Sequence, residues 1–223
     1  MKQVVNVKRR ALAANEERAE ALRARFADTG TLVVNLISSP GSGKTTLLEA
    51  TVRALDGELG CAVLEGDVAT ERDADRIRAL GVPAHQILTG GACHLDARLV
   101  EGGLEAGSFP EVDILFIENV GNLICPTTYD LGEDFKVVLL SVAEGDDKPV
   151  KYPAIFARAD VAVISKTDLL PHVPFDLDAV REQIATLNPD GTILLTSSLK
   201  DQGIDAWCEL LRSRLTAKRR AQG

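Results

Sequence analysis

The hydrophobic positions of the chain follow two alternating patterns. Short apolar runs lie at residues 32–37, 61–64, 114–117, 137–142, 161–164 and 193–195. Between most of them, apolar residues recur every three or four positions, at residues 45–55, 70–80, 95–106, 176–187 and 204–215. The runs are typical of strands buried on both faces, and the longer segments are typical of amphipathic helices. Their alternation predicts an α/β fold: a doubly wound, mostly parallel sheet with helices on both faces.

The two ends of the chain differ from this pattern. Residues 8–27 are rich in Ala, Leu, Arg and Glu and contain neither Gly nor Pro, which predicts a helix that packs on the domain. Gly30 is expected to end it in a left-handed conformation. We therefore divide the chain into an N-terminal helical segment (1–28), one compact domain (29–216) and a basic C-terminal tail (217–223) that we expect to be solvated.

The composition fits one domain and limits the kinds of partner. A chain of 223 residues with 45% hydrophobic content can bury a core of its own. Its net charge of −8 argues against nucleic acid or an anionic membrane surface as the main partner. No apolar run has the length of a membrane span and no secretory pattern opens the sequence, which predicts a cytoplasmic protein. Its four cysteines are then expected to be reduced.

A glycine-rich segment at residues 38–46, Ser-Ser-Pro-Gly-Ser-Gly-Lys-Thr-Thr, follows the first apolar run and precedes a predicted helix. This order is what a phosphate-binding loop of a P-loop NTPase requires, because the backbone N–H groups converge on the β- and γ-phosphates. We expect Lys44 to reach the same phosphates and the Thr45 hydroxyl to ligate Mg2+. Ser38 stands where the full pattern has a glycine, and the alternative interpretation is a surface turn. The residues assigned to the nucleotide here are Gly41, Ser42, Gly43, Lys44, Thr45 and Thr46.

Acidic residues stand at the ends of two further runs. Asp67 follows the second run and Glu118 the third, so a parallel sheet would place both at the edge that carries the phosphate loop. We expect them to serve Mg2+ or the attacking water, and we predict Lys44, Asp67 and Glu118 to be the catalytic residues. Gly121 is expected to approach the γ-phosphate through its N–H. The alternatives are a turn or helix-start carboxylate for Asp67 and a satisfied strand-end acid for Glu118.

A base-recognition element follows the fifth run. Residues 165–168, Ser-Lys-Thr-Asp, resemble the guanine-reading Asn-Lys-x-Asp element with serine in place of asparagine. Asp168 can accept both the N1–H and the N2–H2 of guanine, and the Lys166 stem would lie over the base. Ser198 and Leu199 are placed like the loop whose backbone contacts the guanine O6. The pattern predicts GTP and GDP as ligands; the alternative is a helix-capping turn.

Cysteine and histidine residues form a second candidate site. Cys93 and His94 are adjacent, and Cys125 lies in another loop. Two thiolates and an imidazole suit Zn2+ or Ni2+, but leave a fourth position to water or to a second copy of the chain. Composition alone favours two buried cysteines and a helix-capping histidine. The other cysteines, expected in the core, and the other histidines, expected in loops or at the surface, are Cys61, Cys208, His85 and His172.

Taken together, these segments resemble the HypB family, the GTPases that help insert nickel into nickel–iron hydrogenase. The resemblance is carried by the motifs at residues 38–46, 65–67, 91–95, 118–126 and 147–153. It implies a nickel chaperone that hydrolyses GTP and forms a homodimer when GTP is bound. It also implies a Zn2+ or Ni2+ site at the dimer interface, with the hydrogenase large-subunit precursor or a nickel co-chaperone as partner. The residues implied as its ligands are Cys93, His94 and Cys125.

The sequence departs from some family members near its N-terminus, where it has neither a Cys-x-x-Cys-x-Cys motif nor a histidine-rich stretch. We therefore do not expect tight nickel storage there. Nucleotide and metal are expected to be coupled, because Gly121 and Cys125 are joined by a segment that spans at most about 14 Å. Lys148 and Lys151 are expected to contact the partner subunit or its nucleotide, the alternative being a solvated loop. Hydrolysis should be slow, since neither a general base nor an arginine finger stands out.

Other functions fit part of the pattern. A urease accessory GTPase resembles this chain in the phosphate loop but usually carries Cys-Pro-His, and no histidine follows Cys125 and Pro126. A zinc-stapled dimerisation module would use the cysteines structurally, with the nucleotide as a stabilising ligand. A small-molecule kinase that uses ATP is the third alternative.

Overall fold

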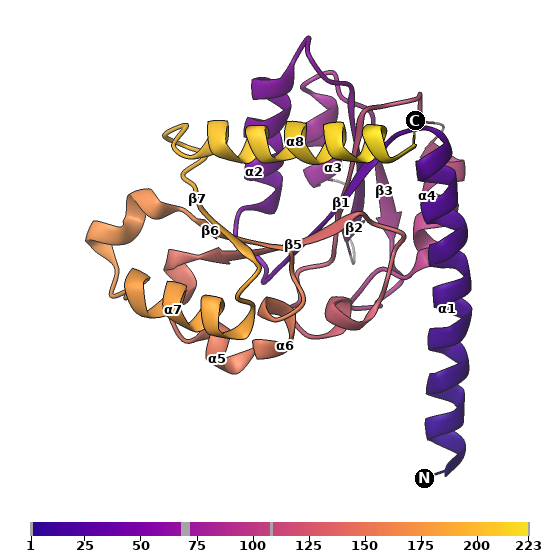
Figure 1. Cartoon of the computed structure of the whole chain (residues 1–223), viewed down its shortest axis with the longest axis horizontal. Helices are drawn as coiled ribbons and strands as arrows, with labels where there is room; N and C mark the ends of the chain where they lie inside the picture. The colour runs from indigo at the N-terminus through magenta and orange to yellow at the C-terminus, as the bar shows by residue number, and fades with distance from the viewer. Residues whose placement is uncertain (1, 68–71, 108, 223) are drawn as a thin grey trace.

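The computed structural model describes residues 2–67, 72–107 and 109–222, with side chains from residue 9 onward (Figure 1). Its centre is a seven-stranded sheet in the order β3-β2-β4-β1-β5-β6-β7, and all neighbouring strands run parallel. The strands are β1 (Leu32–Ser38), β2 (Cys61–Asp67), β3 (Ala84–Leu88), β4 (Ile114–Glu118), β5 (Phe135–Ser141), β6 (Val161–Ser165) and β7 (Thr192–Leu195). The predicted doubly wound α/β fold is confirmed.

Helices connect the strands. The α-helices are α1 (Lys2–Asp28), α2 (Lys44–Leu55), α3 (Arg72–Arg78), α4 (Ala97–Gly107), α5 (Lys148–Lys151), α6 (Pro153–Phe156), α7 (Leu177–Leu187) and α8 (Ile204–Gln222). Short 3-10 helices are η1 (Cys125–Thr128), η2 (Val142–Glu144) and η3 (Thr167–His172). The predicted start of α3 at residue 70 lies outside the described residues. No helix within the described part of the chain is long and apolar enough to cross a bilayer.

Both faces of the sheet are covered, which explains why the strand sequences are continuously apolar. Side chains alternate between the faces along a strand. On one face, Val34 and Leu36 of β1 pack in a cluster with residues of α2 and α8. On the other, Val33 joins a cluster with α1 and α4, and Ile37 joins one with α6 and α7. Figure 1 shows α2, α3 and α8 on one side of the sheet and α5, α6 and α7 on the other.

The strand β3 is absent from the sequence prediction. Its sequence is Ala-His-Gln-Ile-Leu, too short and too polar to read as a buried strand. It forms because β2 offers a parallel edge, on which Leu64 pairs with His85. The interpretation of His85 as a loop or surface histidine is therefore wrong, since it lies half-buried in a strand. His172 is exposed at the end of η3 as expected, and Cys61 and Cys208 are buried in the core.

The described residues of the C-terminal tail are mostly exposed, but they form the end of a helix and two of them form ion pairs. Helix α8 continues through Gln222. The Lys218 Nζ donates to the Thr31 carbonyl (2.6 Å) and pairs with Asp134 (2.7 Å), while Arg219 pairs with Asp113 (2.5 Å). These contacts anchor the last turns beside the start of β1, so the basic residues extend the helix. The basic sequence of the tail does not predict these ion pairs, because the acidic partners come from distant segments of the chain.

Candidate functional site

The glycine-rich segment wraps from the end of β1 into the start of α2. Gly41 and Gly43 have φ angles of 76° and 95°, values that only glycine adopts without strain. The Lys44 side chain is buried and curls back over the loop, where its Nζ donates to the Ser38 Oγ at 2.9 Å. Ser38 therefore supplies an acceptor for this lysine, which the glycine of the full pattern, having no side chain, could not. The conformation is that of a loop built to surround phosphate.

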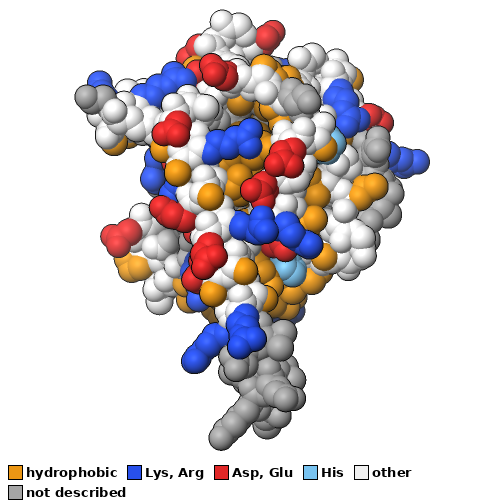
Figure 2. Space-filling model, turned by 90° about the vertical axis from the view of Figure 1, so that its right-hand side faces the viewer, with side chains coloured by type: hydrophobic (Ala, Val, Ile, Leu, Met, Phe, Trp, Pro, Cys, Tyr) orange, Lys and Arg blue, Asp and Glu red, His pale blue; other side chains and the backbone are white. Residues whose placement is uncertain are grey.

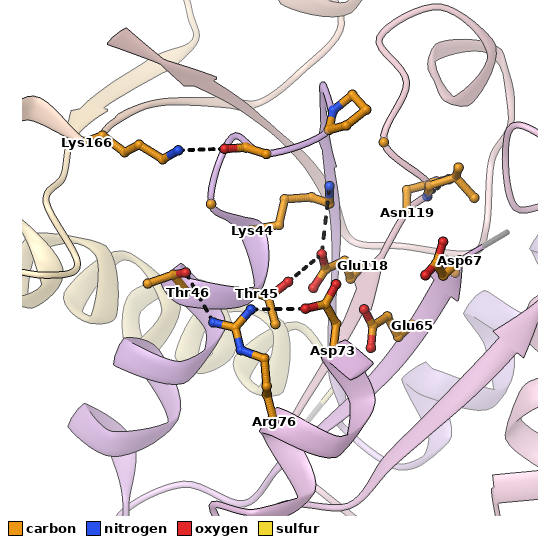
Figure 3. A pocket seen from close by; sticks show the side chains of 16 residues that line it. Lys44, Thr45, Thr46, Glu65, Asp67, Asp73, Arg76, Glu118, Asn119 and Lys166 are labelled. Carbon is orange, nitrogen blue, oxygen red and sulfur yellow. Dashed lines mark hydrogen bonds and ion pairs between the residues drawn. The ribbon is translucent and has the colours of Figure 1, made fainter. Parts of the chain in front are cut away.

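Two buried carboxylates face this loop from neighbouring strands (Figure 3). The Glu118 Oε1 accepts from the Thr45 Oγ1 at 3.1 Å and lies 3.8 Å from the Lys44 Nζ. The register of β2 and β4 pairs Glu118 with Glu65, which is 2% exposed. Among the described residues, the Oε2 atoms of both glutamates have no hydrogen-bond partner. Two orphaned carboxylate oxygens beside a hydroxyl form the donor set that Mg2+ prefers.

The electrostatics of this pair follow from its burial. Desolvation raises the pKa of Glu65 to about 9, with the Glu118 carboxylate adding to the shift. Desolvation likewise raises the pKa of Glu118 to about 7, although the Lys44 ammonium opposes the shift. Two adjacent carboxylates in a site of low dielectric cannot both ionise without a counter-charge. A divalent cation supplies such a charge and would ionise both groups.

The cavity in front of the loop measures about 480 Å³. Asp67 lines it from the end of β2, and α3 contributes Asp73 and Arg76. The Arg76 guanidinium contacts Asp73 at 3.0 Å and the Thr46 Oγ1 at 3.4 Å (Figure 3). Neither α3 residue was predicted from sequence, and neither was Glu65. Only Glu65 carried a usable signal, because it stands two positions before Asp67 and so projects from the same face of β2.

Gly121 fits closely against the phosphate loop. A Cβ atom at Gly121 would lie 2.9 Å from the Pro40 side chain and 3.0 Å from its backbone. Glycine is therefore required for the segment after β4 to come this near. Both residues line the same cavity. The structure thus places Gly121 beside Pro40 of the glycine-rich segment, in the cavity that this segment lines.

A second cavity, of about 150 Å³, lies beside the phosphate loop. The Asp168 Oδ1 accepts from the Ser197 Oγ at 2.5 Å, and the Lys166 Nζ donates to the Gly41 carbonyl at 2.6 Å. Ser165, which replaces the usual asparagine, donates to the Ser42 carbonyl at 2.7 Å and so ties β6 to the phosphate loop. The lining residues are Ser42, Gly43, Thr46, Ser165, Lys166, Asp168, Leu169, Ser198 and Leu199. Every residue predicted to contact the base thus lines one cavity.

Lys148 is not among the described residues that line either cavity. Its Nζ is 4.0 Å from the Glu144 Oε2, and the Glu144 Oε1 accepts from the Ser42 Oγ at 2.5 Å. One carboxylate therefore connects this lysine to the phosphate loop. Lys151 pairs with Asp147, the residue that precedes α5.

The cysteine and histidine residues meet at one point. Cys93 and Cys125 are 32 positions apart, yet their Sγ atoms are 3.0 Å apart, and the Cys93 Sγ is 3.8 Å from the His94 Nδ1. The three ligand atoms all lie within 4.8 Å of one another. The His94 ring stacks on Tyr129 with a centroid distance of 4.0 Å. We call Cys93, His94 and Cys125 the thiol–imidazole cluster.

Protonation in the cluster follows from its contacts. The hydrogen bond with Cys125 raises the pKa of the Cys93 thiol, and burial lowers the pKa of the His94 imidazole. A neutral imidazole is the form that binds a metal, and a bound cation would release the thiol protons. Two soft sulfur ligands and one nitrogen suit Ni2+ or Zn2+ better than Mg2+.

Side-chain amides connect the cluster to the nucleotide pocket, and sequence reasoning did not assign them. Asn119, next to Glu118, accepts from the Leu95 N–H at 3.1 Å just after His94. Asn122 donates to the Cys93 carbonyl at 3.1 Å. The segment after β4 is therefore bonded directly to the loop that carries two of the three cluster residues.

The fold and the first cavity define a P-loop nucleotide-binding protein, with a phosphate loop after β1 and acids at the ends of β2 and β4. Comparison with known proteins agrees, because residues 32–195 match the family model described as the CobW/HypB/UreG nucleotide-binding domain. The chain belongs to the HypB family of hydrogenase maturation factors.

Individual relatives cover nearly the whole chain. It is 48% identical over 203 residues to hydrogenase maturation factor HypB of Escherichia coli K12, covering 91% of this chain and 70% of that protein. It is 44% identical over 208 residues to hydrogenase/urease maturation factor HypB of Helicobacter pylori, covering 92% and 85%. The structure of H. pylori HypB in complex with nickel superposes with a TM-score of 0.87 at 42% identity, over 92% of this chain and 96% of that one. HypB from Archaeoglobus fulgidus gives 0.86 at 40% identity, over 92% and 100%.

Proposed function

We propose that this protein is a GTP-hydrolysing nickel metallochaperone that assists nickel insertion into nickel–iron hydrogenase during maturation. One observation carries the proposal: residues 118–125 begin in the phosphate pocket and end in the thiol–imidazole cluster. Because this segment is short and takes part in both sites, a change of nucleotide in the pocket would alter the geometry of the cluster. The nickel bound to the H. pylori relative supports nickel as the cargo here.

GTP is the proposed substrate. Asp168 would accept two hydrogen bonds from guanine, and Lys166 would lie along the base. Adenine offers no matching donors, which would leave the carboxylate unpaired at a high free-energy cost.

Hydrolysis would use the phosphate pocket. A water oxygen attacks the γ-phosphorus, the bond to the β–γ bridging oxygen breaks with its electron pair on GDP, and both protons of the water leave with the dihydrogen phosphate product. Lys44 and the loop N–H groups stabilise the charge that develops on the phosphate oxygens. Thr45, Asp67 and Glu118 would hold Mg2+, with Glu65 beside them; when bound, Mg2+ neutralises charge on the β- and γ-phosphates. We expect slow turnover, since neither a general base nor an arginine finger can be assigned among the described residues of the pocket.

Metal binding would use Cys93, His94 and Cys125, with a water or a ligand of a second copy in the fourth position. Exposed apolar side chains lie close to the cluster in sequence: Ile124 is 64% exposed and Leu88 is 59% exposed. Such residues favour burial against another chain, which supports a homodimer, and we propose that GTP binding promotes it. Lys148 and Lys151 would contact the partner subunit or its nucleotide.

The proposed cycle follows from this arrangement. GTP draws two subunits together and completes the metal sites. Hydrolysis releases Gly121 from the γ-phosphate, and the shift passes to Cys125 along the chain and to Cys93 and His94 through Asn119. Nickel then leaves for the hydrogenase large-subunit precursor or a nickel co-chaperone.

The decisive experiment is a titration of Ni2+ and of Zn2+ into the protein held with GDP or with a non-hydrolysable GTP analogue. Oligomeric state is recorded in the same samples, and Cys93→Ala serves as control for the site. We expect affinity or stoichiometry to differ between the two nucleotide states, because linked equilibria shift each other. Equal affinities in both states would falsify the coupling.

A zinc-stapled dimerisation module is the second candidate, favoured by the presence of two thiols in the cluster. It predicts tight Zn2+ binding that is the same with GDP and with the GTP analogue, and a dimer in both. The same titration therefore distinguishes the two candidates.

A further inference from the structure

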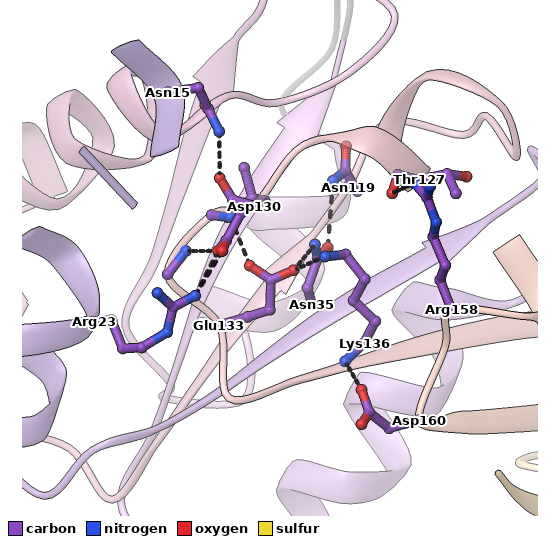
Figure 4. A network of polar contacts seen from close by, with 12 residues as sticks. Asn15, Arg23, Asn35, Asn119, Thr127, Asp130, Glu133, Lys136, Arg158 and Asp160 are labelled. Atoms are coloured by element: carbon purple, nitrogen blue, oxygen red, sulfur yellow. Dashed lines mark hydrogen bonds and ion pairs between the residues drawn. The ribbon is translucent and has the colours of Figure 1, made fainter. Parts of the chain in front are cut away.

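The long helix α1 contacts both loops of the thiol–imidazole cluster through one side chain. Asn15 lies in the middle of α1 and is only 7% exposed. Its Oδ1 accepts from the Ala97 N–H at 2.8 Å. Its Nδ2 donates to the Asp130 carbonyl at 2.8 Å, a bond shown in Figure 4. Both halves of the amide are therefore used, each on a different segment of backbone.

These two segments are the ones that carry the cluster. Ala97 begins α4, three positions after His94. Asp130 lies five positions after Cys125 and follows Tyr129, whose ring stacks on His94. The amide of Asn15 thus spans the gap between the loop that supplies Cys93 and His94 and the loop that supplies Cys125.

We propose that Asn15 is a positioning residue for the metal site: it sets the separation of the two ligand-bearing loops and thereby the metal affinity. The inference rests on the proposed use of Cys93, His94 and Cys125 as metal ligands. Metal sites tolerate deviations of only about 0.2 Å in ligand distances, so the spacing of the loops matters. A buried amide with two short hydrogen bonds is a directional spacer, which an apolar contact is not.

Removing the amide has a defined consequence. Asn15→Ala leaves the buried Ala97 N–H and the partly buried Asp130 carbonyl without this partner, and the loops gain freedom to shift. Outer residues that orient metal ligands typically change metal affinity by about 10- to 100-fold. We expect the lower end, about 10-fold weaker Ni2+ binding, because Asn15 acts through backbone and not on the ligand atoms.

Two neighbours on α1 provide matched controls. Arg18 pairs with Glu101 of α4, and Arg23 pairs with the Asp130 carboxylate, so each contacts only one of the two segments. Figure 2 views the face that includes α1 and shows basic and acidic side chains interspersed on it. Surface pairs of this kind contribute little stability. Arg18→Ala and Arg23→Ala therefore test whether weakening the attachment of α1 to the domain is enough to change the Ni2+ affinity.

The test uses the full chain and Ni2+ alone as probe. Affinity, the thiolate-to-nickel charge-transfer spectrum and thermal unfolding are measured for the wild type, Asn15→Ala, both arginine variants and Cys93→Ala. We expect Asn15→Ala to bind Ni2+ about 10-fold more weakly with an altered spectrum, and the arginine variants to bind within about twofold of wild type. GTP-analogue affinity should be unchanged in all three α1 variants.

Wild-type Ni2+ affinity and spectrum in Asn15→Ala, with binding lost in Cys93→Ala, overturn the inference but leave the metal site intact. Undiminished Ni2+ binding in Cys93→Ala instead refutes the proposed site, and the inference with it. If Asn15→Ala does not fold, Asn15→Asp replaces it. That variant retains the acceptor for Ala97 but loses the donor to Asp130, and wild-type Ni2+ binding by it also overturns the inference.

Discussion

In the phosphate pocket, the functional side chains stand at the ends of adjacent parallel strands, whereas Cys93, His94 and Cys125 stand on loops that distant side chains hold together. The register of β1, β2 and β4 fixes Glu65 and Glu118 relative to the phosphate loop. Backbone hydrogen bonds along the whole sheet maintain that register. The sheet itself therefore sets the positions of these two carboxylates relative to the phosphate loop.

The cluster depends on fewer interactions. The amides of Asn15, Asn119 and Asn122 contact its two loops, and each contact is a single hydrogen bond. A site held in this way can change shape at a cost of about 1 kcal/mol per bond. The difference suits the proposed function, because a nucleotide pocket must hold its geometry through the reaction while a chaperone must release its metal.

The largest effect should come from the phosphate pocket. Lys44→Ala removes the buried ammonium that faces the β- and γ-phosphates, and steady-state GTP hydrolysis should fall by at least about 100-fold. Ni2+ binding without nucleotide should be unchanged, because Lys44 does not contact the cluster loops. Hydrolysis is measured by phosphate release.

The exposed Arg53 on the same helix gives the control, and Arg53→Ala should hydrolyse GTP at the wild-type rate. Substantial hydrolysis by Lys44→Ala would remove this lysine from the reaction.

The second-largest effect should distinguish a cysteine of the thiol–imidazole cluster from a cysteine of the core. Cys125→Ala removes a cluster sulfur and should weaken Ni2+ binding by about 100-fold, since a ligand is lost. Cys61→Ala should leave Ni2+ affinity unchanged but lower the free energy of unfolding by about 1–2 kcal/mol, because Cys61 is buried in the core. Metal titration and chemical denaturation of both variants are the measurements. Equal Ni2+ affinity in the two variants contradicts the assignment of the cluster.

The same contrast explains how far the sequence predicts this molecule. The phosphate loop is local: residues 38–46 carry glycines, lysine and threonine in a fixed order between a strand and a helix, so one stretch of sequence identifies it. The cluster is not local. Cys93 and Cys125 are brought together by the chain path, and composition alone favoured two core cysteines; family resemblance supplied the pairing.

Other features of the structure could not be predicted from the sequence for similar reasons. The pairing of Glu65 with Glu118 depends on the register of β2 and β4, which the apolar runs do not specify. Asn119 stands in a motif that the sequence highlights, but its partner at Leu95 is visible only in the fold. The strand β3 and the end of α8 depend on a neighbouring edge and on distant acids, and neither leaves a local signal.

A third prediction addresses the connection between the two regions. Asn119→Ala frees the Leu95 N–H while leaving the ligands of both sites in place. The ratio of Ni2+ affinities with GTP analogue and with GDP should fall toward one, and we expect a change of about fivefold, the factor that corresponds to roughly 1 kcal/mol. Asn188→Ala, whose amide donates to the remote Ala159 carbonyl, is the control and should keep the wild-type ratio. An unchanged ratio in Asn119→Ala would exclude Asn119 as the link and leave the chain from Gly121 to Cys125 and the hydrogen bond from Asn122 to the Cys93 carbonyl.

The smallest effect concerns the docking of α1 and its dependence on pH. Burial raises the pKa of Asp130, but the Arg23 guanidinium and the Gly132 N–H together lower it by more than burial raises it. The pKa of Asp130 therefore lies below its usual value. A carboxylate with a depressed pKa stabilises the fold above its unfolded pKa, near 3.9, and loses that contribution as the pH falls through the folded value. Both side chains are more than a third exposed, so solvent screening limits the contribution to less than about 1 kcal/mol. Thermal unfolding between pH 7 and pH 3 should therefore show a slightly steeper loss of stability for the wild type than for Arg23→Ala. Parallel curves would mean that the pair contributes nothing, and that Asn15 and the apolar face of α1 hold the helix without it.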